Sequence, residues 1–145
     1  MMSVLSRVAE DIEKTITHEI GKAVDPHEKL RVFIRLCMEV VHNKREYYQV
    51  NMDFWTQINQ KKEVRQVIAE HYRKFRAACA TIIKEGIEKG DFKKVDAMEY
   101  SSFIIAVVDG LSLQWLFDRQ IDKLIQLQSA EACLLGGLTL GDKSV

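Results

Sequence analysis

The sequence predicts an all-α protein, a single domain of residues 1–145 folded as a bundle of six helices. Two observations favour this fold class. Apolar residues recur at intervals of three and four over most of the chain, which is the spacing of one helix face. The chain has one proline and seven glycines, too few breakers for a turn-rich β fold. No segment has the pattern of a credible strand, so we expect helices throughout.

The first two predicted helices meet at a short connection. An apolar stripe covers about residues 3–20, and Gly21 follows as a stop signal. The second helix has a complete start signal, because Asp25 can cap its free amides and Pro26 suits its first position, where a missing N–H costs nothing. Glu28 completes a capping box. The helix extends to about residues 42–43, with the apolar stripe Leu30, Phe33, Cys37, Val40 and Val41.

The third and fourth predicted helices differ in their patterns. About residues 45–59 are dense in aromatic side chains on two adjacent lines, so this helix should be buried over more than one side. About residues 62–89 keep the helical period for several turns, with charged residues on the opposite face. Gly90 ends this helix, and Asp91-Phe92 complete a turn.

The last two predicted helices are apolar over most of their surface. Asp96 and Glu99 form a second capping box, and helices follow over about residues 97–118 and 124–138. A helix that is apolar all round must be covered all round, and pairing with the same helices of a second copy would cover both. The alternative is that they form the centre of a monomeric core. The expected dimer-interface residues are Ile105, Val108, Ser112, Trp115, Leu116, Ala130 and Leu134.

Charge and cysteine usage limit the classes of function. Lys plus Arg and Asp plus Glu both number 21, so the net charge is zero, and this chain lacks the basic excess of a domain that grips DNA phosphates. Cys37, Cys79 and Cys133 are far apart, which favours a reducing compartment. The N-terminus does not have the pattern of a signal peptide. The most apolar stretch, residues 103–117, is too short to cross a bilayer. We therefore expect a soluble, cytoplasmic protein with no membrane partner.

Four segments resemble, in order, the C-terminal domain of TetR-family transcriptional regulators. They are Phe54-Trp55, HYRKF at residues 71–75, IKEGIEKGDF at residues 83–92 and DGLSLQWLFD at residues 109–118. The resemblance is concentrated in residues 47–119. It extends over nearly the whole chain, because residues 1–21 resemble the helix that links the two domains in that family.

The resemblance implies a repressor's homodimer built on the last two long helices, with a cavity inside each subunit lined by the middle ones. An effector that binds one arrangement better than the other would shift the spacing of the DNA-binding heads. The family places a helix-turn-helix domain before this region, and no segment here matches it. DNA binding would therefore belong to a missing N-terminal domain, and its residues cannot be assigned to positions of this sequence.

The expected ligand is a small apolar or aromatic effector, with no cofactor. Pockets between helices are mostly apolar with a few placed polar groups. Asp109 lies inside the most apolar helix and, if buried, needs a partner, for which an arginine is natural. For any single aromatic residue, ordinary core packing is the alternative to ligand contact. The candidate ligand residues are Phe33, Cys37, Trp55, Tyr72, Phe75, Arg76, Cys79, Phe103, Val107 and Gln114.

Two other classes of function remain open at this point. Glu39 and His42 have the ExxH spacing of helical metal bundles, but no second such motif exists, so a metal site is disfavoured. No motif of a catalytic nucleophile, metalloprotease or phosphate loop is present, so we expect no enzyme. The alternatives to a regulator are a helical protein-interaction module and a bundle-type metal or cofactor protein.

Overall fold

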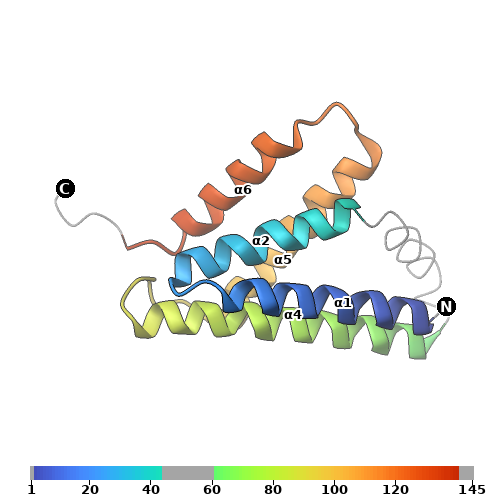
Figure 1. The fold of residues 1–145 in the computed structure, drawn as a ribbon, viewed down its shortest axis with the longest axis horizontal. Coiled ribbons are helices and arrows are strands. Elements are labelled where there is room, and N and C mark those ends of the chain that lie inside the picture. The colour runs from blue at the N-terminus through green and yellow to red at the C-terminus, as the bar shows by residue number, and fades with distance from the viewer. Residues whose placement is uncertain (1, 44–60, 141–145) are drawn as a thin grey trace.

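The computed structural model describes residues 2–43 and 61–140, which form a bundle of helices (Figure 1). The predicted all-α class is confirmed. The helix expected at about residues 45–59 lies outside the described residues. The described helices are α1 (Met2–Gly21), α2 (Pro26–Asn43), α4 (Lys62–Glu88), α5 (Ala97–Phe117) and α6 (Lys123–Gly136).

Helix α2 holds the arrangement together, because it contacts α1, α4, α5 and α6. Helices α1 and α4 run side by side along one side of the bundle, and α6 lies on the opposite side of α2 (Figure 1). Helix α5 packs most extensively against α4. The core sits around α2, and its fully buried apolar side chains include Leu30, Phe33, Ile34, Met38, Ile83 and Ile104.

Aspartates fix the starts of three helices. The amide of His27 donates to Oδ1 of Asp25 (3.2 Å), as expected for the start of α2. The amide of Glu99 donates to Oδ1 of Asp96 (3.0 Å), which confirms the predicted cap of α5. Asp122 caps α6 in the same way through the amide of Ile125 (3.1 Å). Each side chain satisfies one of the amides that have no partner within the helix.

The turn after α4 is built on two glycines. Gly90 has a φ of +77°, the left-handed conformation that glycine adopts without strain. The amides of Asp91 and Phe92 both donate to the carbonyl of Gly86 (2.8 and 3.0 Å). The ring of Phe92 then lies where a Cβ at position 86 would stand, so only glycine fits there. The edge of His27 packs against this ring, with 4.8 Å between ring centroids.

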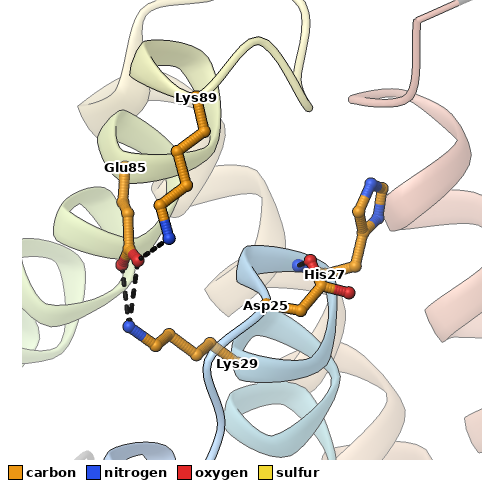
Figure 2. A network of polar contacts seen from close by, with 5 residues as sticks. All are labelled: Asp25, His27, Lys29, Glu85 and Lys89. Atoms are coloured by element: carbon orange, nitrogen blue, oxygen red, sulfur yellow. Dashed lines mark hydrogen bonds and ion pairs between the residues drawn. The ribbon is translucent and has the colours of Figure 1, made fainter.

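A polar network joins this end of α4 to the first turn of α2 (Figure 2). The ammonium group of Lys29 donates to both carboxylate oxygens of Glu85, at 2.9 and 3.1 Å. Lys89, one turn further along α4, donates to the same carboxylate at 3.0 Å. The two cations hold the pKa of Glu85 below its usual value, chiefly through their hydrogen bonds. The network therefore fixes the register between α2 and α4.

Helix α5 has one covered face and one open face. Residues 97–117 are long and apolar enough to cross a membrane by length and composition, a test that core helices of soluble proteins also meet. Only 28% of its most apolar window is buried within the single chain. The outward stripe contains Phe103, Ala106, Gly110, Gln114 and Phe117, at helical spacing. This single chain therefore leaves a long apolar surface uncovered.

Candidate functional site

A carboxylate lies in the seam between α4 and α5. The hydroxyl of Tyr72 donates to Oδ2 of Asp109, with 2.6 Å between the oxygens. Burial raises the pKa of Asp109, and the hydrogen bond from Tyr72 lowers it in part. The sequence predicted an arginine as the partner of Asp109, but the partner found is the Tyr72 phenol. No ion pair joins this carboxylate to a cation among residues 2–43 and 61–140.

Two thiols lie close to this seam. Burial strongly raises the pKa of Cys37 on α2, and the nearby Cys79 and Asp109 raise it further. Burial also raises the pKa of Cys79 to about 12, with a smaller opposing effect from a hydrogen bond to Ser101. Both thiols are therefore protonated at neutral pH, which makes them poor nucleophiles. We therefore expect the two thiols to provide a weakly polar surface near Asp109 and not to act as nucleophiles.

Two polar atoms, one turn further along α4 and α5, have no hydrogen-bond partner among the described residues. The hydroxyl of Ser112 is buried one turn after Asp109 on α5, and its residue is only 2% exposed. The Nε of Arg76, one turn after Tyr72 on α4, is also buried without a hydrogen-bond partner in the described structure. Buried polar groups in folded proteins are nearly always paired, so these atoms are candidates for contact with a bound molecule.

His71 has a third such atom, but it faces a different neighbour. Its buried Nε2 also lacks a hydrogen-bond partner among the described residues. Burial lowers the pKa of His71, and the carboxylates of Glu13 and Glu10 on α1 raise it in part. The imidazole therefore belongs to the α1–α4 contact and not to the Asp109 seam.

The structure divides the predicted ligand residues into three groups. Phe33 and Cys79 are fully buried in the core, whereas Cys37, Tyr72, Phe75, Arg76 and Val107 are half-buried. Phe103 and Gln114 are exposed on the outward face of α5. Trp55 lies outside the described residues. Of the predicted ligand residues, Tyr72 donates a hydrogen bond to Asp109, and Cys37 lies near enough for the charge of Asp109 to raise its pKa.

Two residues of the seam were not among the predicted ligand residues. The sequence marked Asp109 as a polar residue that needed a partner, and it placed Ser112 in the dimer interface. Their spacing of three residues puts both on adjacent lines of one helix. The sequence therefore contained an indication of this seam, because a carboxyl and a hydroxyl lie one turn apart in a mostly apolar helix.

Most of the predicted interface residues face the interior of their own chain. Val108, Ser112, Trp115, Ala130 and Leu134 are all buried in the single chain, and Ile105 is half-buried. A side chain that its own chain covers has little surface left for a second copy. Leu116 is the predicted residue that stays exposed. The large apolar residues that the two helices do expose are Met98, Phe103, Leu116, Phe117, Leu124 and Ile125.

The sequence of the chain matches a family of transcription regulators. Residues 26–133 match the family described as the BetI-type transcriptional repressor, C-terminal. The match covers more than half of the chain, so the chain belongs to this family of regulator domains. The family is not enzymatic, and the resemblance and the non-enzymatic class inferred from the sequence are both confirmed.

Solved structures of regulators share the fold. A protein from Saccharomonospora viridis, described as a transcriptional regulator in complex with choline, aligns with a TM-score of 0.86 at 20% identity, over 97% of this chain and 73% of its own. A TetR-family protein from Syntrophomonas wolfei aligns with a TM-score of 0.77 at 19% identity, over 97% and 73%. FadR from Bacillus subtilis, in complex with stearoyl-CoA, aligns with a TM-score of 0.71 at 22% identity, over 92% and 73%. No curated protein matches the sequence.

Proposed function

We propose that this chain is the effector-binding and homodimerisation domain of a cytoplasmic TetR-type repressor. In this proposal residues 1–21 link it to a helix-turn-helix domain that binds the operator and lies outside these 145 residues. Family membership supports a regulator, and the zero net charge agrees with a domain that does not itself hold DNA.

The effector we infer is a small organic cation with an apolar body. The single observation that carries this inference is the partly buried carboxyl of Asp109, which has a phenol as its hydrogen-bond donor and no ion-paired cation in the described structure. A buried carboxylate is costly unless a positive charge pairs with it, and an apolar seam also favours methyl or methylene groups. The aromatic ring of Tyr72 can contact a cation through its face, and the neutral thiol of Cys37 provides a weakly polar surface for its apolar groups.

Two of the aligned regulators were solved with different kinds of effector. The choline bound to the Saccharomonospora viridis protein is a cation of this size class. The stearoyl-CoA bound to FadR has no cationic group that could pair with the Asp109 carboxylate. The seam therefore favours a choline-like molecule over an acyl-CoA for this chain.

Calorimetric titration tests the effector class with a matched pair of molecules. Choline and its neutral carbon isostere, 3,3-dimethyl-1-butanol, have nearly the same shape but differ in charge. We expect choline to bind and the isostere to bind much more weakly, because only the cation compensates the carboxylate. Equal binding of the two, or tight binding of stearoyl-CoA alone, would show that charge recognition by Asp109 is not the basis of selectivity.

The second part of the proposal is a homodimer built on the open face of α5 and on α6. Exposed apolar patches of this extent mark partner surfaces on soluble proteins. Ala106 and Gly110, between Phe103 and Phe117, would let two helices approach closely. A second copy that uses the same patch gives a closed two-fold pair. Light scattering of the purified chain should give twice the mass of one chain, and a monomer at micromolar concentration would remove this part.

The alternatives from other classes have less support. A metal protein needs clustered ligands, and no group of three or more His, Cys, Asp or Glu side chains in residues 2–43 and 61–140 could hold a metal ion. In a module that only binds other proteins, we expect every buried polar atom to have a hydrogen-bond partner within the domain. In the described structure, buried polar atoms of Ser112 and Arg76 have none. Both observations favour a domain that binds a small-molecule ligand in its interior.

A further inference from the structure

The charge environment of Asp109 is unusually simple. Helix α4 presents the Tyr72 phenol to it, and α2 presents the Cys37 thiol, which is neutral at physiological pH. Between Glu99 and Asp118, the other ionisable side chain of helix α5 is the Tyr100 phenol, which donates to the carbonyl of Leu134. Arg76 follows Tyr72 by one turn on α4, and no ion pair between it and Asp109 is present in the described residues. The carboxyl thus has hydrogen-bonding neighbours but no fixed counter-charge there.

We propose that effector binding is proton-linked: the half-buried Asp109 carboxyl, which has the Tyr72 phenol as its hydrogen-bond donor and no ion-paired cation in the described structure, exchanges a bound proton for a cationic effector. The proposal rests on the proposed function, because it assigns the proton exchange to the same seam. The exchange balances, since the seam gains the charge of the effector and releases one proton to the solvent.

The physical reason is desolvation. An ionised carboxylate half-enclosed by apolar groups loses much of its hydration, and the proton is the smallest group that removes its charge. The raised pKa of Asp109 agrees with this, and the Tyr72 hydrogen bond limits the rise because it favours the ionised form. A bound ammonium group would supply the missing counter-charge and favour ionisation.

A first experiment needs no effector. Carboxyl ¹³C chemical shifts of the empty chain, followed through a pH titration, give the midpoint of Asp109, with the signal assigned by its absence in Asp109→Asn. We expect a midpoint above the usual value of an exposed aspartate. In Tyr72→Phe the midpoint should rise further, because the hydrogen bond that favours ionisation is gone. A midpoint for Asp109 at the usual value of an exposed aspartate would overturn the proposal.

A second experiment measures the linkage with choline as the probe. Below the carboxyl midpoint, the affinity should weaken by about tenfold for each unit of falling pH, because one proton competes with each bound cation. Near the midpoint, the calorimetric heat should depend on the ionisation heat of the buffer, which reports the released proton. Asp118→Asn is the matched control and should keep the same pH dependence, whereas Asp109→Asn should lose choline binding.

The outcomes separate this proposal from the proposed function. Choline binding with a flat pH dependence and no buffer effect would overturn the proton linkage and leave the cation site intact. No binding of choline or of tetramethylammonium at any pH would overturn the cation site, and the linkage with it. Binding that follows the Asp109 midpoint supports both.

Discussion

The phenolic oxygen of Tyr72 lies 2.6 Å from Oδ2 of Asp109, and this hydrogen bond joins α4 to α5 at the middle of the most apolar helix. A carboxyl at such a place lowers the stability of the empty domain, because apolar side chains of the same volume would pack without the cost of desolvating a charge. We infer that the carboxyl is kept for ligand recognition. The relationship therefore yields predictions in which stability and binding move in opposite directions.

Asp109→Asn should stabilise the empty domain at neutral pH. The folded-state pKa of Asp109 is raised, so the folded chain binds more protons than the unfolded chain. The stability linked to this carboxyl is then fully present below the unfolded pKa and decreases as pH rises through the folded pKa. Because asparagine does not ionise, the stability of the variant does not fall with rising pH for this reason. Thermal unfolding at neutral and acidic pH should show a gain for the variant at neutral pH only, and a loss of stability at neutral pH would contradict the assignment.

Ser112→Ala should also stabilise the empty domain. The serine hydroxyl is buried without a hydrogen-bond partner in the described structure, and a group in that state costs about 1–3 kcal/mol. Alanine occupies nearly the same volume in a helix and has a higher helix propensity. Urea unfolding should give a higher free energy of unfolding, with Ser102→Ala as the control, because the Ser102 hydroxyl on the same helix donates to the carbonyl of Met98 (3.1 Å). A clear destabilisation by the Ser112 change would show that its hydroxyl is paired.

Gly86→Ala should destabilise the chain although alanine favours helices. The ring of Phe92 occupies the place of the added methyl group, so the turn after α4 must shift. Forcing extra volume into a packed site typically costs about 1–3 kcal/mol. Gly21→Ala is the control, because nothing within 4 Å would meet its Cβ. Equal stability of the two variants in urea would mean that the Phe92 ring moves aside freely.

Glu85→Gln should weaken the joint between α2 and α4 in a pH-dependent way. The folded-state pKa of Glu85 is lowered by Lys29 and Lys89, so its contribution is present above the unfolded pKa and lost as pH falls through the folded pKa. The difference in melting temperature between wild type and variant should shrink on acidification and with added salt. A difference that stays constant over both changes would indicate a packing effect and not an ion pair.

Phe103→Glu should convert the proposed dimer to a monomer. Its ring is 59% exposed on the open face of α5, so the change leaves the core of the single chain intact but sets two carboxylates against each other at a two-fold axis. Val24→Glu is the control, because Val24 is 81% exposed in the α1–α2 connection, away from that face. Light scattering should report half the wild-type mass for Phe103→Glu alone. A monomeric mass for the control as well would point to general destabilisation.

The sequence predicted the helices well where local signals exist. Asp25 and Asp96 marked the starts of α2 and α5, and Gly90 marked the end of α4. The cap at Asp122 was missed, because no Glu or Gln follows at the third position to complete a box. Local hydrogen-bond chemistry is encoded in neighbouring residues and can therefore be recognised without the fold.

The orientation of α5 could not be predicted in the same way. A helix with apolar residues on every face gives no angular signal, so periodicity did not distinguish the buried Val108 from the exposed Phe103. The pairing of Tyr72 with Asp109 spans 37 residues and depends on how α4 and α5 pack. In the sequence, the polar residues of α5 gave the indication of which face of the helix packs against α4 at Asp109.

A crystal structure of the chain grown with choline would show whether Asp109 binds the effector. We expect the ammonium group within ion-pairing distance of the Asp109 carboxylate, beside the Tyr72 ring and between α4 and α5. Choline bound away from this seam, with the Tyr72–Asp109 hydrogen bond undisturbed and no cation beside it, would mean that Asp109 does not select the effector.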